Sequence, residues 1–199
     1  GHMVGRRGLW YKMTFYDRAV RVPLLLAGPG IKPRRRIAEP VSHLDLLPTL
    51  AGLAGVRVGD ANLDGRDLSP ALKGGAIKQG DVIGEYMGEG YDVPVVMIRR
   101  GGRKFVHSVS DGPELYDLAR DPRELRNLAM ESSHRKAVDA LVREAERRWD
   151  FQRITADVIA SQRQRRVIHA ALVTGRIAPW DYAPQTDAGA WYYRKYDTT

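Results

Sequence analysis

The sequence predicts a mixed α/β protein, of the α+β kind in its C-terminal part, and three patterns along its 199 residues support this prediction. A short apolar run near the N-terminus is followed by a helical pattern. Strand-like runs in the middle are separated by turn residues, and the last third has the periodicity of helices. We therefore expect a strand and a helix, a small antiparallel sheet with helices, and a helical, aromatic C-terminal extension.

The first expected element is a strand at Val22–Ala27, an apolar run that is followed by Gly28-Pro29-Gly30. Within a complete sheet this strand would be buried; without neighbours its apolar edge would be exposed and would promote association. A helix is expected over Ser42–Leu53, because Ser42 and Asp45 have the spacing of a capping box. One face of this helix is expected to pack on the strand, because leucine recurs at Leu44, Leu47, Leu50 and Leu53.

The middle of the chain predicts an antiparallel meander. A loop around Gly59–Gly65 and one helical turn at Leu68–Leu72 precede it. The expected strands are Val82–Met87, Val95–Arg100, Lys104–Ser108 and the edge element Glu114–Leu118, which ends at Asp121-Pro122. Gly101 and Gly102 predict a hairpin, because glycine tolerates the positive φ angles of tight turns.

Helical periodicity begins at Ser132. One face of an amphipathic helix of about four to five turns is formed by Ala137, Leu141, Ala145 and Trp149. A second helix is expected over Ala156–Thr174, with Gly175 as its C-cap. Residues 178–199 are rich in tryptophan and tyrosine, so we expect them to lie against a surface of this chain or of a partner.

Composition excludes several classes of function. The fractions of hydrophobic and charged residues, 43% and 28%, are those of a globular protein. No apolar run reaches the roughly 20 residues of a membrane span, and a secretory signal is absent, so we expect a cytoplasmic protein without a membrane partner. The absence of cysteine excludes thiol catalysis. The net charge of +8 does not predict a nucleic-acid partner, because the basic residues are scattered without interleaved aromatic residues.

Three stretches of the chain, in a fixed order, carry recognisable motifs. The first is Gly8–Tyr16 with Arg21–Leu24, and the second is His43–Leu50. The third is a signature made of Glu114–Leu118, Asp121-Pro122, Glu124 and Asn127-Leu128. Together they resemble the sulfatase family of the alkaline-phosphatase-like superfamily, in which the first stretch directly follows the Asp-His-Gly metal motif.

Further strings indicate one branch of that family. They are Gly8–Met13, Gly84–Tyr86, Met97–Arg100, Ser161–Arg163 and Trp180–Tyr182. These strings resemble the C-terminal part of choline sulfatases, so the resemblance covers nearly the whole chain.

The resemblance implies a domain organisation. Residues 1–3 look like the remnant of an expression tag, and residues 4–58 would be the remainder of the catalytic α/β domain, with one strand and one helix of its large sheet. Residues 59–131 would form the C-terminal antiparallel-sheet subdomain. Residues 132–199 would form the helical extension of choline-sulfatase type, through which we expect a homo-oligomer.

The resemblance also implies a chemistry that this chain does not contain in full. Sulfatases hydrolyse sulfate esters with a formylglycine, made from cysteine, beside calcium or another divalent cation. This chain has no cysteine and no residues that match the family's metal ligands. We therefore expect a C-terminal fragment of a sulfuric-ester hydrolase, inactive by itself and binding no cofactor alone, whose partner is the missing N-terminal catalytic half. The expected substrate is choline-O-sulfate, or another small sulfate or phosphonate ester.

Three residues are predicted to contact the substrate. By motif position Lys12 matches the lysine that binds the sulfate group; the alternative is a surface lysine paired with a carboxylate. Glu89, between two glycines, is the candidate carboxylate for the choline ammonium, and Glu85 is the competing choice. Asp197 would add a second carboxylate from a neighbouring subunit, unless the aromatic tail only packs on a surface.

Two histidines could suggest a metal site, but their surroundings do not support one. His43 and Asp45 are two residues apart on a helix, so their side chains diverge. His107 has no second ligand at a useful spacing. We expect capping or buried hydrogen bonds for both histidines and no metal ligand in this chain. A second hypothesis for function is a non-catalytic scaffold or oligomerisation module, derived from a sulfatase, that uses its aromatic tail for assembly.

Overall fold

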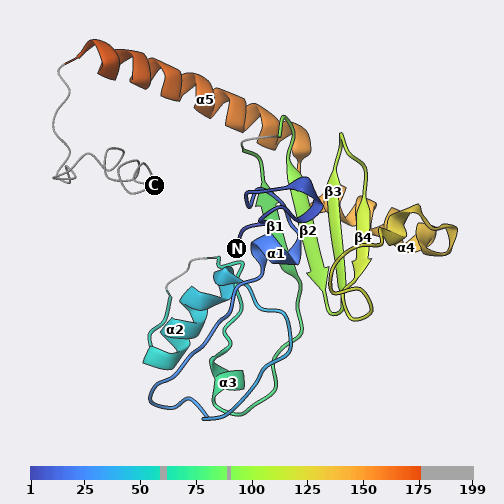
Figure 1. Ribbon diagram of the computed structural model, residues 1–199. Helices are drawn as coiled ribbons and strands as arrows, with labels where there is room; N and C mark the ends of the chain where they lie inside the picture. The colour runs from blue at the N-terminus through green and yellow to red at the C-terminus, as the bar shows by residue number, and fades with distance from the viewer. Residues whose placement is uncertain (59–61, 89–90, 176–199) are drawn as a thin grey trace, which may run out of the picture. The chain divides into compact units, whose positions relative to one another are not determined.

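The computed structural model describes residues 1–58, 62–88 and 91–175 (Figure 1). The chain divides into two compact units, Gly1–Ala156 and Asp157–Thr199. Helices and strands follow one another as α1 (Asp17–Val20), α2 (Leu46–Ala54), α3 (Ser69–Leu72), β1 (Val82–Tyr86), β2 (Val95–Arg100), β3 (Arg103–Ser108), β4 (Glu114–Asp117), α4 (Arg135–Arg148) and α5 (Phe151–Thr174). Short 3-10 turns lie at Arg6–Gly8, His43–Asp45, Leu128–Met130 and Ser132–His134.

The sheet is an antiparallel meander in the order β1-β2-β3-β4, and Figure 1 shows these strands side by side. The four predicted strands are confirmed to within one residue at each end. The Gly101-Gly102 hairpin is confirmed as well: Gly101 has a φ of 54°, and Arg100 of β2 pairs with Arg103 of β3 on either side of the turn. Glycine fits this turn because a side chain would be strained at a positive φ.

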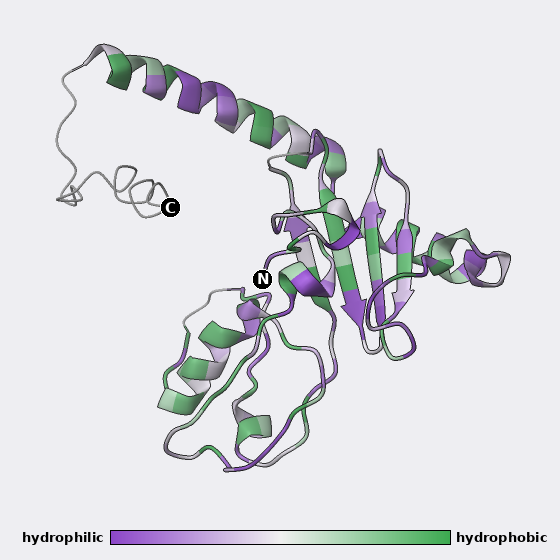
Figure 2. Ribbon diagram, viewed as in Figure 1, coloured by the Kyte–Doolittle hydropathy of each residue, from purple (hydrophilic) through white to green (hydrophobic). Residues whose placement is uncertain are grey.

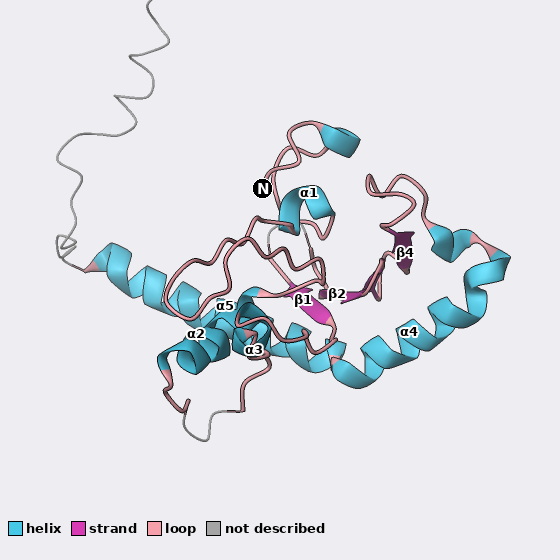
Figure 3. Cartoon of the chain, turned by 90° about the horizontal axis from the view of Figure 1, so that it is seen from below, coloured by secondary structure: helices cyan, strands magenta, loops and turns pink. Residues whose placement is uncertain are grey.

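The hydrophobic core lies between one face of the sheet and α4. Ile83 pairs with Ile98, Ile98 with Phe105, and Phe105 with Leu115, so one row of apolar side chains crosses all four strands. This row packs with Val138, Ala145, Trp149 and Phe151. Figure 3 shows the sheet between α4 and the N-terminal segment that contains α1. The two faces of the sheet therefore have different partners.

Helix α4 confirms the predicted amphipathic helix, although it starts at Arg135 rather than Ser132. Val138 and Ala145 are its buried residues. Trp149 follows the helix with an extended backbone and is still buried. Helix α5 starts at Phe151, five residues before the predicted start at Ala156, and ends at Thr174 as expected.

The capping box at the start of the α2 region is confirmed. Leu44 N donates to Ser42 Oγ at 3.2 Å, and Ser42 N donates to Asp45 Oδ2 at 2.9 Å. Asp45 also accepts from Arg66 N at 2.7 Å and from Arg66 Nη2 at 2.8 Å. Burial raises the pKa of Asp45, but the hydrogen bonds from Arg66 and Ser42 and the charge of Arg66 together lower it below its ordinary value. One local motif thus also holds the loop around Arg66.

The prediction of a buried strand at Val22–Ala27 is wrong. This segment forms neither helix nor strand, and Leu25 is 87% exposed. Leu44, Leu47 and Leu50 of the following helix are also exposed, so the predicted packing of that helix on the strand is wrong too. The physical reason is that a strand needs a neighbour for its backbone hydrogen bonds, and among the described residues only β1–β4 form a sheet. Apolar side chains of this segment, Val22, Leu24 and Leu25, are nevertheless exposed, and Figure 2 shows apolar residues along α2.

The second unit is described only as far as Gly175, the residue that follows α5. From Asp157 onwards most side chains of this helix are exposed, including Val167, Ile168, Leu172 and Val173. In the described part of the chain, no helix combines the length and the apolar character that crossing a membrane requires. The aromatic tail at 178–199 lies outside the described residues.

Candidate substrate-binding site

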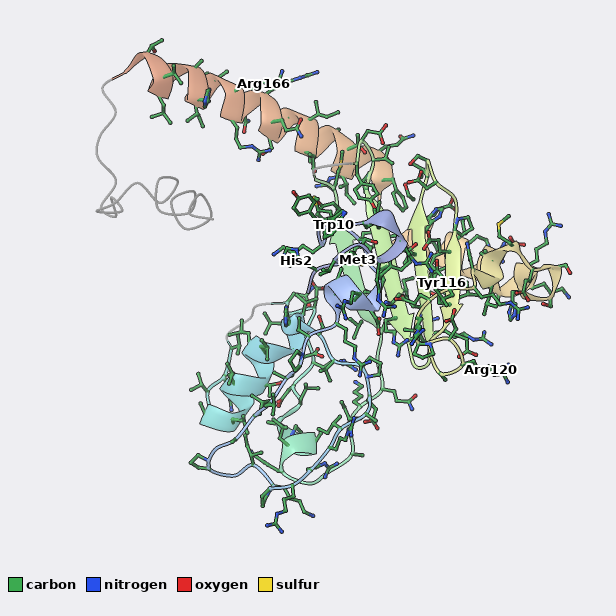
Figure 4. All side chains as sticks on the ribbon, in the orientation of Figure 1. His2, Met3, Trp10, Tyr116, Arg120 and Arg166 are labelled. Carbon is green, nitrogen blue, oxygen red and sulfur yellow. The ribbon has the colours of Figure 1, made fainter. Side chains whose placement is uncertain are left out.

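The predicted sulfate-binding lysine follows a tightly closed N-terminal loop. Met3 N donates to Tyr11 O at 2.9 Å, and Gly5 N donates to Leu9 O at 2.9 Å. Met3 and Trp10, which are labelled in Figure 4, both belong to this loop, and the Met3 side chain is buried. These bonds fix the backbone on the N-terminal side of Lys12.

Lys12 itself has an exposed side chain. Its carbonyl accepts a hydrogen bond from Thr14 N at 2.9 Å, so its backbone lies in a tight turn. An exposed ammonium is compatible both with the predicted contact to a sulfate group and with the alternative of a surface lysine.

A buried ionic cluster includes Phe15 and Asp17, which follow Lys12 by three and five residues. Lys104 Nζ donates to Phe15 O at 2.9 Å, to Glu124 Oε1 at 2.8 Å and to Asp17 Oδ1. The second oxygen of Glu124 accepts from Asp17 N at 2.7 Å. Lys104 is 1% exposed and Glu124 is 3% exposed. All three protons of the ammonium are used, as burial of a lysine requires.

Alternation along β3 explains how this lysine reaches the N-terminal segment. Phe105 belongs to the core beneath α4, and the next residue in a strand points to the opposite face. Lys104 therefore extends from the other face of the sheet, where Phe15 and Asp17 lie. Two adjacent residues of β3 thus connect the core to the segment after Lys12. Phe105 packs in the core, and Lys104 bonds the carbonyl of Phe15.

Glu124 reaches the cluster from a strained turn. Its φ is 57°, in the left-handed region, which costs a residue with a side chain about 1–2 kcal/mol. Glu124 N donates to Asp121 O at 3.1 Å, so the strain lies in the turn predicted at Asp121-Pro122. The surrounding structure holds the carboxylate in place against this cost.

Two arginines lie near the carboxylates of the cluster. Burial lowers the pKa of the Arg99 guanidinium, and the charges of Asp17 and Glu124 oppose that shift. Arg21 Nη1 lies 4.0 Å from Asp17 Oδ2, and its side chain is 77% exposed. Positive charge near the two carboxylates lowers the cost of burying them.

A small pocket of about 170 Å³ opens beside the same loop. Its lining includes Thr14, Tyr16, Tyr91, Asp111 and Glu114. Burial raises the pKa of the Tyr91 hydroxyl, and the charges of Asp111 and Glu114 raise it further. The pocket is therefore aromatic and acidic.

Of the carboxylates considered for choline recognition, the structure describes only Glu85. Glu89 and Asp197 both lie outside the described residues. Tyr86 and Tyr91, on either side of the Glu89 loop, have ring centroids 5.5 Å apart in an edge-to-face arrangement. The competing candidate, Glu85, accepts a hydrogen bond from Trp149 Nε1 at 2.6 Å. Glu85 thus has a structural partner at the end of α4.

The histidines have no metal-binding surroundings. His107 is 7% exposed and lies between Phe105 and Phe151, at centroid distances of 6.0 and 5.6 Å. Neither ring nitrogen has a hydrogen-bond partner in the part of the chain that the structure describes, so the expected buried hydrogen bond is wrong. His43 is exposed at the start of its 3-10 turn. Over the described residues, no group of three or more His, Cys, Asp or Glu is arranged to hold a metal.

Sequence reasoning did not single out Lys104 and Asp17, and it quoted Glu124 only as part of a signature. One signal was available, because Lys104 belongs to a predicted strand and directly precedes the apolar pair Phe105 and Val106. A charged residue inside a strand between two others is expected to have a buried partner. The identity of that partner could not be read from the sequence.

Comparisons with known proteins agree along the whole chain. The family model of the N-sulphoglucosamine sulphohydrolase C-terminal region matches residues 5–149, and the model of the choline sulfatase C-terminus matches residues 156–196. A choline-sulfatase of Rhizobium meliloti (strain 1021) is 40% identical over 203 residues, which cover 98% of this chain and 39% of that protein. A delta 4,5-hexuronate-2-O-sulfatase of Bacteroides thetaiotaomicron is 38% identical over 146 residues, which cover 67% of this chain and 29% of that protein.

Solved structures give the same result. A 2-O GAG sulfatase has a TM-score of 0.63 at 34% identity, and the match covers 81% of this chain and 36% of that chain. A sulfatase from Bacteroides thetaiotaomicron VPI-5482 has a TM-score of 0.62 at 36% identity, covering 74% of this chain and 34% of that chain. The chain thus spans well under half the length of the proteins that it matches.

Proposed function

Because this chain belongs to the sulfatase family, we propose that it is the C-terminal part of an enzyme that hydrolyses choline-O-sulfate to choline and sulfate. The observation that carries this proposal is the match of two family models in succession, a sulfatase C-terminal region followed by the choline sulfatase C-terminus. The identity to a choline-sulfatase over 98% of the chain supports the same substrate.

The proposal divides the chemistry between this chain and the rest of the enzyme. Sulfatases use a formylglycine and a divalent cation such as calcium, but the residues present here do not fit either group. The sequence contains no cysteine from which a formylglycine could form, and the described residues contain no ligand cluster. We therefore assign both groups to the rest of the enzyme, and we expect this chain to be inactive by itself.

Lys12 is the residue of this chain that we assign to the sulfate group. Its exposed ammonium carries three donors, and its backbone is held by hydrogen bonds of the neighbouring residues. A fixed cation stabilises the negative charge that grows on sulfate oxygens in the transition state, and removing one such group costs about 10²–10³ in rate.

Choline requires a different kind of contact, because its quaternary ammonium cannot donate a hydrogen bond. Aromatic faces and carboxylates are the groups that bind it. We assign this role to Glu89, which is flanked in sequence by Tyr86 and Tyr91, and to Asp197 from a neighbouring subunit. This assignment requires a homo-oligomer, for which the aromatic tail is the proposed contact, and we place the enzyme in the cytoplasm.

The proposal is tested by assaying the full-length protein with choline-O-sulfate as wild type and as Lys12→Ala, Glu89→Gln and Lys136→Ala. Lys136 is an exposed lysine of α4 and serves as the matched control. We expect Lys12→Ala to lower kcat by about 10²-fold or more, Glu89→Gln to raise KM, and Lys136→Ala to change neither.

Each outcome bears on a different part of the proposal. Activity that survives Lys12→Ala would refute the assignment of Lys12 to the sulfate group. Loss of activity with Lys12→Ala but no change of KM with Glu89→Gln would refute the assignment of Glu89 to choline and leave the assignment as a sulfatase intact. A full-length protein without any sulfatase activity would favour the scaffold hypothesis.

A further inference from the structure

We propose that Lys104 and Glu124 are positioning residues for Lys12, acting through the backbone of Phe15 and Asp17. The inference rests on the proposed function, because it assumes that Lys12 contacts the substrate. It adds two residues, more than 90 positions further along the chain, that neither the motif resemblance nor the comparisons assign to the site.

Lys12 stands in a short span between two fixed points. On one side Tyr11 O accepts from Met3 N at 2.9 Å, and on the other side Phe15 O accepts from Lys104 Nζ at 2.9 Å. The chain from the Tyr11 carbonyl to the Phe15 carbonyl is four residues long and spans at most about 14 Å when extended, and the Thr14 N to Lys12 O bond shortens this span. The location of the Lys12 backbone therefore depends on both fixed points.

The second fixed point is held by charges rather than by apolar packing. Lys104 bonds the carbonyl of Phe15 and the carboxylate of Asp17, while Glu124 bonds both Lys104 and Asp17 N. The backbone is thus held at the carbonyl of one residue and at the amide of a residue two positions later. These bonds fix both the position and the orientation of the backbone between Phe15 and Asp17, because each hydrogen bond has a preferred direction.

Stability alone does not account for this cluster. Apolar residues of similar volume often replace a buried ion pair without loss of stability. Here the pair is nearly fully buried, and one member sits at a φ of 57°, where a side chain is strained. Strain and burial of charge together are the features expected where the position of a backbone matters for function.

The fold connects this fixed point to a rigid region. Lys104 lies on β3, which is hydrogen-bonded to β2 and β4 on its two sides. Its neighbour Phe105 is 1% exposed in the core. A sheet strand inside a packed core moves less than a loop. The bond from Lys104 to Phe15 O therefore restricts the motion of the backbone next to Lys12.

The test is a double-mutant cycle in the full-length enzyme with choline-O-sulfate and with inorganic sulfate as inhibitor. Glu124→Gln replaces one of the two accepting oxygens by an NH₂ group, which is a donor. This group would face another donor, either Lys104 Nζ or Asp17 N, so one hydrogen bond is lost. Asp17→Asn is the second variant, because the side chain of Asp17 is 24% exposed and its loss is better tolerated. The matched control is Glu144→Gln, which removes a carboxylate bonded to Arg100 and Arg148 on the α4 side of the sheet.

We expect Glu124→Gln and Asp17→Asn to lower kcat/KM about tenfold or more and to weaken inhibition by sulfate, with no such effect of Glu144→Gln. In the Lys12→Ala background the same two variants are expected to change kcat/KM by less than about twofold, because the effects of two substitutions are not additive when one residue acts through the other. If the cluster served only global stability, each variant would lower kcat/KM by the same factor with and without Lys12.

Three results would overturn the inference. They are equal losses with and without Lys12, full activity of Glu124→Gln and Asp17→Asn, and failure of both variants to fold while Glu144→Gln folds, which would make the cluster a purely structural one. If Lys12→Ala itself has no effect, the assignment of Lys12 to the sulfate group fails instead, and if the wild-type enzyme has no sulfatase activity the proposed function fails, so these failures are distinguishable from failure of the inference.

Discussion

At the scale of single residues, two buried polar side chains of β3 have opposite surroundings. Lys104 uses all its donors, whereas His107, three residues later and on the α4 side, has no partner for either ring nitrogen among the described residues. An unpaired buried polar group costs about 1–3 kcal/mol. The aromatic neighbours of His107 explain its burial, and they also supply no hydrogen bond.

His107 makes the stability of the protein depend on pH. Burial lowers its pKa, and the charge of Glu146 opposes this only in part. A histidine whose folded pKa lies below its unfolded pKa leaves stability unaffected above pH of about 6.5 and lowers it as the pH falls below that value. We expect His107→Phe to flatten this decline between about pH 7 and 5 and to raise stability at neutral pH by about 1–2 kcal/mol.

The measurement is denaturant unfolding of the full-length protein across this pH range. His169→Gln, an exposed site on α5, is the control and is expected to leave the curve unchanged. If the stability of His107→Phe falls with decreasing pH as steeply as that of the wild type, groups other than His107 cause the decline.

At the scale of elements, polar contacts fix α4 on the sheet in addition to the core. Asp81 accepts from Arg100 at 2.7 Å and from Arg148 at 2.7 Å, and Glu144 bonds the same two arginines. The hydrogen bonds with Arg100 lower the pKa of Asp81 and of Glu144. These groups are partly exposed, so each pair is worth at most about 1 kcal/mol. The network sets the orientation of the helix more than its stability.

A second contact between elements is the bond from Trp149 Nε1 to Glu85 Oε1, which joins the corner after α4 to β1. Trp149→Phe keeps most of the apolar contact and removes the donor. We expect a loss of about 1.5–3 kcal/mol, because the bond involves a charged acceptor, with KM for choline-O-sulfate unchanged. Thermal unfolding and steady-state kinetics of the full-length protein check this. If Glu85→Gln raises KM for choline-O-sulfate without changing stability, the result would support Glu85 as the carboxylate that contacts choline.

At the scale of the whole molecule, the first unit exposes apolar side chains that an ordinary globular protein buries. The large exposed ones near the N-terminal segment include Val22, Leu24, Leu25, Leu44, Leu47 and Leu50. Beside part of this region a groove of about 1370 Å³ separates the segment around residues 20–43 from β1 and β2. Exposed apolar side chains promote association where they gather into a patch.

We therefore expect the 199-residue chain to associate in solution. Light scattering over a concentration series is expected to show species larger than a monomer. The double variant Leu25→Glu, Leu47→Glu is expected to reduce association, while Val167→Glu, at an exposed position of α5, is the control for an added charge. A monodisperse monomer at all concentrations would contradict this prediction.

The sequence by itself determined the elements whose causes are local. The capping box of Ser42 and Asp45, the Gly101-Gly102 hairpin and the face of α4 follow from bonds or contacts within a few residues, and short patterns record them. The motifs also identified the family, because they keep their order along the chain. The strand at Val22–Ala27 failed because an apolar run indicates burial but does not supply the neighbouring strand that it needs.

Only the tertiary structure decided which distant side chains meet. Lys104 reaches Phe15 and Asp17 across 89 and 87 positions of sequence, and Trp149 reaches Glu85 across 64. No pattern in one sequence encodes such pairs, because they depend on how the faces of the sheet are covered. The N-terminal segment covers one face and α4 the other, and this arrangement turns a lysine in a strand into the support of the predicted sulfate contact.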